Sequence, residues 1–100
     1  MTQEESIKHR DVNVLLDCLA EEAAELIQVI MKIKRFGLDS YNPFDHDKKT
    51  NFNLFHQELG DLLAVIEMLE DETDFGVDRE LIQMAILEKH IKAEKFIPFW

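Results

Sequence analysis

Apolar residues recur at helical spacing along most of the chain and predict three α-helices. The first predicted helix covers residues 4–36, the second about 50–72 and the third 79–95. The apolar stripe of the first helix consists of Val12, Leu15, Leu19, Ala23, Leu26, Ile30 and Ile33. The stripe of the second consists of Phe55, Leu59, Leu62, Ile66 and Leu69.

Residues typical of helix ends stand at the boundaries of these segments. Gly37 is placed as the C-terminal cap of the first helix, either Thr50 or Asn51 as the N-cap of the second, and Asp78 as the N-cap of the third. Residues 38–49 contain the turn-forming dipeptide Asn-Pro. They therefore predict an irregular connection between the first two helices.

The third predicted helix is apolar around most of its circumference, unlike the other two. Its apolar residues are Leu81, Ile82, Met84, Ala85, Ile86, Leu87 and Ile91. Such a helix must be covered on several sides, and two neighbouring helices do not suffice. We therefore expect a single all-α domain over residues 1–100, a compact bundle of three main helices completed by association into a homodimer or tetramer.

Composition and charge exclude several classes of function. The formal net charge of −10 argues against binding to nucleic acid, which requires clustered Lys and Arg. No apolar run approaches the length of a membrane span, and the first residues lack the order of a signal peptide. We expect no membrane association and a cytoplasmic location.

Two acidic pairs at i, i+3 spacing are the candidate chemistry. Glu22 and Glu25 lie on the first predicted helix, and Glu58 and Asp61 on the second. Projection at about 100° per residue places each pair along one border of its apolar stripe. If the two helices pack along these stripes, the four carboxylates converge.

Four converging anions repel one another strongly and need a counter-charge. No Lys or Arg stands at the matching positions of either predicted helix near the two pairs. A hard divalent cation is therefore the better explanation, and oxygen ligands favour Mg²⁺, with Mn²⁺ as an alternative.

The strings EEAAEL at residues 21–26 and ELGDLL at residues 58–63 resemble the signature of the MazG-like nucleoside triphosphate pyrophosphohydrolases. This resemblance extends over about residues 12–95 and implies an all-α, magnesium-dependent enzyme that assembles as a dimer or tetramer. It implies Glu22, Glu25, Glu58 and Asp61 as metal ligands and catalytic residues. The implied reaction is hydrolysis of a nucleoside triphosphate to the monophosphate and pyrophosphate, which clears unwanted nucleotides from the cell.

Lys32 and Lys89 are the candidate phosphate-binding residues. Lys32 follows Glu25 by seven residues on nearly the same azimuth, and the resemblance also indicates Lys89. The aromatic residues that could stack on a base are Phe36, Tyr41, Phe44 and Phe52, with Phe36 as the primary candidate.

Two alternatives stay open. The same fold could act on dUTP or phosphoribosyl-ATP, because the asparagine that members of the family often carry on the third helix is absent. A non-catalytic helical interaction module, in which the acids only increase solubility, is the alternative of a different class.

Overall fold

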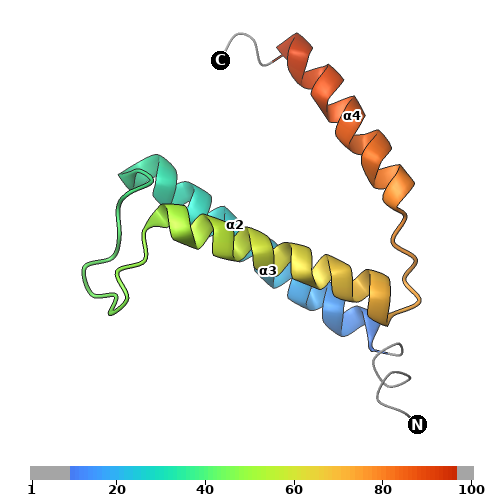
Figure 1. Ribbon diagram of the computed structural model, residues 1–100, viewed down its shortest axis with the longest axis horizontal. Coiled ribbons are helices and arrows are strands. Elements are labelled where there is room, and N and C mark those ends of the chain that lie inside the picture. Colours follow the sequence, from blue (N-terminus) through green and yellow to red (C-terminus); the bar gives the residue numbers. More distant parts are fainter. Residues whose placement is uncertain (1–9, 97–100) are drawn as a thin grey trace.

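The computed structural model describes residues 10–96, and all of its regular elements are helices. They are α2 (Val12–Phe36), α3 (Asn51–Glu72) and α4 (Arg79–Phe96). Figure 1 shows α2 and α3 as an antiparallel hairpin, with α4 projecting from the end of α3. The prediction of an all-α chain with three main helices is confirmed. Between residues 10 and 96, no helix has the length and apolar character needed to cross a membrane.

The first helix begins later than the sequence pattern predicted. Asp11 has extended backbone angles, and its carboxylate accepts a hydrogen bond from the backbone N–H of Asn13 at 2.8 Å. This N-cap begins the helix at Val12, so residues 10 and 11 are not helical. The remainder of the predicted extension, residues 4–9, lies outside the described residues. At the other end, Gly37 caps α2 as predicted, with φ of +92° and its N–H bonded to the carbonyl of Ile33.

The caps of the other two helices follow the prediction. Thr50 is the N-cap of α3, and its hydroxyl accepts the backbone N–H of Asn53 at 3.2 Å. Asn51, the other candidate, is the first helical residue. Asp78 precedes α4, and its carboxylate accepts the backbone N–H of Leu81 at 3.1 Å.

The seam between α2 and α3 repeats every three and four residues, as in a pair of supercoiled helices. Its α2 positions, buried or half-buried, are Leu15, Leu19, Glu22, Leu26, Val29 and Ile33. Its α3 positions are Asn51, Phe55, Glu58, Leu62, Val65, Leu69 and Glu72. The predicted stripes missed Val29 and Val65, which are buried, and wrongly included Ile30, which is 38% exposed. The reason is that a stripe drawn at 3.6 residues per turn drifts away from a seam that repeats every 3.5.

Asn51 attaches the connection between α2 and α3 to the hairpin. Its side-chain Nδ2 donates to the carbonyl of Gly37 at 3.0 Å, and its backbone N–H donates to the carbonyl of Ser40 at 2.9 Å. A single antiparallel bridge between Tyr41 and Thr50 joins the two ends of the connection. Asn51 is only 5% exposed, so these bonds are shielded from water.

Helix α4 does not pack against α2 or α3, and this corrects the prediction of a compact three-helix bundle within one chain. Its apolar residues from Leu81 to Ile91 are 37–62% exposed. The apolar faces of α2 and α3 are already buried against each other in the seam. Helix α4 has no single apolar stripe with which it could pack on the outer surface of the hairpin. The start of α4 is nevertheless attached to α3, because Arg79 Nη2 donates to Glu70 Oε1 at 2.8 Å and lowers the pKa of that carboxyl.

We predict that Asn51→Ala lowers the free energy of unfolding by about 1–2 kcal/mol, because the hydrogen bond from the buried Asn51 side chain to the carbonyl of Gly37 is lost. Urea denaturation followed by circular dichroism measures the difference. Asn53→Ala is the matched control on the same helix, and we expect it to change stability by less than about 0.5 kcal/mol because its side chain is exposed. Equal effects of the two substitutions would contradict the role given to Asn51.

Candidate metal centre

Glu22 and Glu58 occupy inward positions of the α2–α3 seam, where a helix pair ordinarily places apolar residues. Glu22 stands between the seam residues Leu19 and Leu26, and Glu58 follows Phe55 in the same way on α3. Both glutamates are half-buried. The sequence pattern placed them at the border of their stripes, and the structure corrects this by moving them into the seam itself.

The other member of each pair lies one helical turn further on and is exposed. Asp61 completes a three-residue cluster, because carboxylate oxygens of Glu22, Glu58 and Asp61 all lie within 4.8 Å of one another. Glu25 is close enough to Glu22 and Glu58 to raise the pKa of each. The structure therefore brings three of the four carboxylates that the sequence singled out into one cluster, with the fourth, Glu25, beside Glu22 and Glu58.

The electrostatics of this cluster are unfavourable for the protein alone. Burial raises the pKa of the Glu22 carboxyl, and the charges of Glu25 and Asp61 raise it further. Burial also raises the pKa of Glu58, and the neighbouring carboxylates of Glu25, Asp61 and Glu22 raise it further. One oxygen of each glutamate, Oε2, is buried without a hydrogen-bond partner among the described residues. Such groups normally carry a cost in stability unless something binds them.

Two acids elsewhere on the same hairpin, Glu70 and Glu72, are paired with arginines. Arg10 Nε lies 3.0 Å from Glu72 Oε2, at the end of the seam, and Arg79 pairs with Glu70. These are the ion pairs found among residues 10–96, and neither involves any of the four carboxylates at the seam.

The donor set fits a hard divalent cation. All the available atoms are carboxylate oxygens, which Mg²⁺ and Mn²⁺ prefer. The Oε2 atoms of Glu22 and Glu58 are buried without a partner, and a bound cation would both satisfy them and remove the repulsion. Glu22, Glu58 and Asp61 are the residues that would hold it, with Glu25 beside them.

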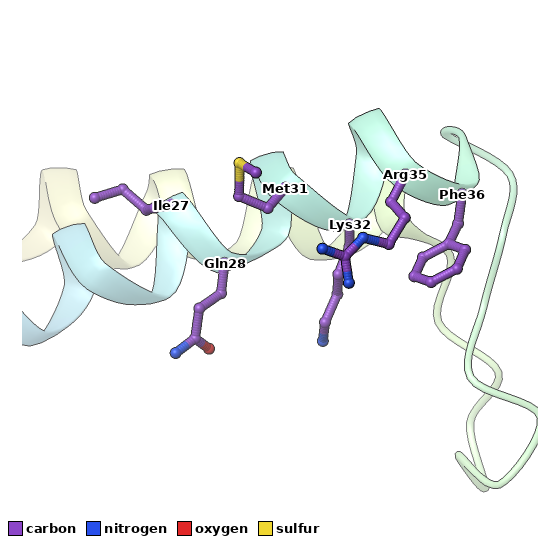
Figure 2. A pocket seen from close by; sticks show the side chains of 6 residues that line it. All are labelled: Ile27, Gln28, Met31, Lys32, Arg35 and Phe36. Carbon is purple, nitrogen blue, oxygen red and sulfur yellow. The ribbon is translucent and has the colours of Figure 1, made fainter.

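Lys32 and Phe36, two of the predicted substrate-binding residues, line surface hollows on the same hairpin. A hollow of about 300 Å³ runs along the C-terminal half of α2 and is lined by Ile27, Gln28, Met31, Lys32, Arg35 and Phe36. Figure 2 shows Gln28, Lys32 and Phe36 extending from the same side of α2. A second cavity of about 420 Å³, lined by Lys32 and Phe36 as well, lies under the connection.

Lys89 is not brought to the cluster by this chain. It lies in the middle of α4, which does not pack against the hairpin. Its role in phosphate binding stays a prediction, which requires that another subunit place α4 near a carboxylate cluster.

Sequence reasoning missed most of the lining of the second cavity. The sequence names Tyr41 as one of several aromatic candidates for base stacking, and it offers no substrate-binding role for Asn42, Asp45 or Lys49. Phe44, another of those aromatics, is 93% exposed and does not line the cavity. The available signal was the density of turn-forming Asn, Pro and Asp residues in the connection, which indicates an ordered structure rather than a plain linker.

Comparison with known proteins finds no family model that matches the chain, and no curated protein or solved structure with a significant match.

We predict that Mg²⁺ or Mn²⁺ raises the melting temperature of the wild-type protein and has no such effect on Glu58→Gln. A ligand present at about 100 times its Kd stabilises the folded state by about 2.7 kcal/mol. Without metal, Glu58→Gln should be at least as stable as the wild type, because a repelling buried anion is removed. Thermal denaturation with and without added metal measures both effects.

Glu21→Gln is the control, since Glu21 is exposed on the same helix beside the cluster. Mg²⁺ or Mn²⁺ should raise the melting temperature of this variant as much as that of the wild type. If Glu58→Gln were stabilised by Mg²⁺ as strongly as the wild type, the assignment of the metal centre would be wrong.

Proposed function

We propose that this chain is a MazG-like nucleoside triphosphate pyrophosphohydrolase that requires Mg²⁺, or Mn²⁺ in its place. The observation that carries the proposal is the cluster of Glu22, Glu58 and Asp61 at the seam, with Glu25 beside it and with buried, unpartnered oxygens on Glu22 and Glu58. The resemblance of residues 21–26 and 58–63, which contain these same carboxylates, to the family signature also supports it. The proposed substrates are non-canonical or surplus nucleoside triphosphates, and the products are a monophosphate and pyrophosphate.

The four carboxylates divide naturally into two roles. Glu22, Glu58 and Asp61 present oxygens to a common point and are the metal ligands. When bound there, a magnesium ion supplies charge neutralisation for the phosphates and polarises a water molecule. Glu25 lies beside this point and is exposed, so its carboxylate is available to accept the proton of the attacking water.

The charge of the site also explains the dependence on metal. Four carboxylates and the net charge of −10 repel a triphosphate, so binding requires a cation at the cluster. Lys32, exposed about 10 Å further along α2, provides a positive charge on the side of the connection. Its role is to bind a phosphate oxygen.

We predict that the protein releases pyrophosphate from at least one nucleoside triphosphate when Mg²⁺ is present. Replacement of any one ligand, as in Glu22→Gln, Glu58→Gln or Asp61→Asn, should lower turnover by at least about a hundredfold, because transition-state charge loses its stabilisation. Glu25→Gln should lower turnover by about 10²–10⁴-fold through loss of the base. A panel of canonical and modified triphosphates, assayed for pyrophosphate and monophosphate, is the measurement.

Several results would overturn this proposal. Full activity in Glu58→Gln and Asp61→Asn would remove the metal centre from the mechanism, and release of orthophosphate with a diphosphate would place the cleavage at another bond. Preferred turnover of dUTP or phosphoribosyl-ATP would keep the fold and reaction type but change the substrate. No turnover of any triphosphate would favour an interaction module. Glu21→Gln is again the control, and its turnover should be close to that of the wild type.

We propose further that the chain functions as a homodimer or tetramer, with α4 at a contact between subunits. The support is that six large apolar side chains of α4, from Leu81 to Ile91, are at least 37% exposed. Each side chain of this kind stabilises a protein by about 1.5–3 kcal/mol when it is buried. An apolar surface of this extent usually marks an interface, and a closed symmetric pair is the commonest way to cover it.

We predict that sedimentation at micromolar concentration finds a dimer or a larger species, and that Leu87→Asp shifts it toward the monomer. The charged side chain would have to be desolvated at the contact, which costs several kcal/mol. Glu88→Gln, at the adjacent exposed position on the same helix, should not change the assembly. A monodisperse wild-type species of 11.8 kDa would contradict the prediction.

A further inference from the structure

The cavity under the connection is a separate feature from the carboxylate cluster. Its volume of about 420 Å³ lies within the ordinary range of small-molecule sites. One wall is formed by Lys32 and Phe36 of α2, and the other by the connection, including Tyr41 and Pro43. Part of its lining is therefore aromatic or apolar, and part is able to form hydrogen bonds.

The wall formed by the connection is held in place by its own hydrogen bonds. The carboxylate of Asp45 accepts the backbone N–H groups of Asp47 at 3.2 Å and Lys49 at 3.1 Å. The side-chain oxygen of Asn42 accepts the backbone N–H of Phe44 at 3.0 Å. A wall ordered in this way loses less entropy when a ligand binds.

These bonds also determine which hydrogen-bonding groups are left for a ligand. The Asn42 side-chain oxygen and each oxygen of Asp45 already accept one backbone N–H group, which reduces their capacity to accept from a ligand, and the amide nitrogen of Asn42 is available to donate. The ammonium group of Lys32 and the hydroxyl of Tyr41 are further donors in the lining. A ligand that matches this lining is a flat ring that carries carbonyl oxygens.

The position of the cavity relates it to the carboxylate cluster. Lys32 follows Glu25 by seven residues on α2, and Asn51 precedes Glu58 by seven residues on α3. Seven residues are two helical turns, or about 10 Å along the hairpin, and they return to nearly the same azimuth. The cavity and the cluster thus lie on one line along the same pair of helices, with Lys32 at the cavity's edge toward the cluster. Figure 2 shows Lys32 and Phe36 on one side of α2.

We propose that this cavity binds the base of the nucleotide, stacked against Tyr41, and selects bases that carry a carbonyl at the donor-lined edge. The proposal rests on the proposed function for the placement of the phosphates at the cluster. Base-on-aromatic stacking accounts for the affinity, and the amide donor of Asn42 accounts for the selectivity, while Lys32 binds a phosphate oxygen.

The test is binding of inosine 5′-monophosphate, adenosine 5′-monophosphate and ribose 5-phosphate to the full chain with Mg²⁺, by calorimetry. Inosine and adenosine differ at position 6, where a carbonyl replaces an amine, and the third compound lacks a base. We expect the inosine nucleotide to bind several-fold more tightly than the adenosine nucleotide, and ribose 5-phosphate to bind most weakly. Tyr41→Ala should weaken binding of the inosine nucleotide by about tenfold.

Phe44→Ala is the matched control, because Phe44 is an aromatic residue of the same connection that does not line the cavity. It should bind the inosine nucleotide like the wild type. Tyr41 is also the single tyrosine of the chain, so its ring protons form a distinct NMR signal. Those signals should shift when the inosine nucleotide is added to wild-type protein, a measurement that does not depend on the folding of any variant.

The outcomes separate this proposal from the proposed function. Unchanged binding in Tyr41→Ala, together with unshifted Tyr41 signals, would overturn the base site, even if pyrophosphate release continued. Tighter binding of the adenosine nucleotide would overturn the selection for a carbonyl. Inosine nucleotide binding that depends on Tyr41, in a protein that hydrolyses no triphosphate, would support the base site and refute the pyrophosphohydrolase.

Discussion

Repulsion among the carboxylates gathered at the α2–α3 seam, with Glu22 and Glu58 half-buried at its centre, is the unfavourable interaction on which the proposed chemistry depends. A two-helix seam gains stability from each apolar residue that it buries, and this one gives up an inward position on each helix to an acid. The exposed Asp61 and Glu25 add further negative charge instead of compensating it. The same arrangement is what gives the site its affinity for a cation, because binding relieves a strain already present in the fold.

The apolar core of the hairpin is small, so it offers little stabilisation to offset the repulsion between these carboxylates. Its buried apolar side chains, among the residues described, are Leu15, Val29, Val65 and Leu69. A core of this size is small for a chain of 100 residues, and the polar anchor at Asn51 accordingly takes on structural importance. Association through α4 and binding of a cation at the cluster would both add to this small core. The proposed active state and the most stable state of the protein are therefore expected to coincide.

Local signals in the sequence predicted the helices and their caps well. Thr50, Asp78 and Gly37 cap helices through interactions with residues three or four positions away, so the sequence alone contains the information. The four carboxylates could be found in the same way, because i, i+3 spacing fixes their common face. The burial of Glu22 and Glu58 within the seam could not be predicted in this way, because it depends on how the seam repeats along the paired helices.

The placement of α4 and the cavity depended on relations between distant residues. The apolar pattern of α4 is compatible with two arrangements, one in which α4 packs on the hairpin and one in which it projects away from it. The sequence does not distinguish them, and the structure shows the second. The cavity needs Lys32 of one helix, Asn51 of the other and the connection between them at once. No single stretch of sequence contains that arrangement.

The connection over residues 38–49 supplies no residue to the seam and none to the carboxylate cluster. Its internal hydrogen bonds and its attachment through Asn51 make it a nearly self-contained unit added to the end of the hairpin. Substitutions at Tyr41, Asn42 or Pro43 can therefore alter the shape of the cavity while the carboxylates keep their positions. During evolution, substitutions in this one loop can therefore change which ligand the cavity binds, while the carboxylate cluster on the helices is retained.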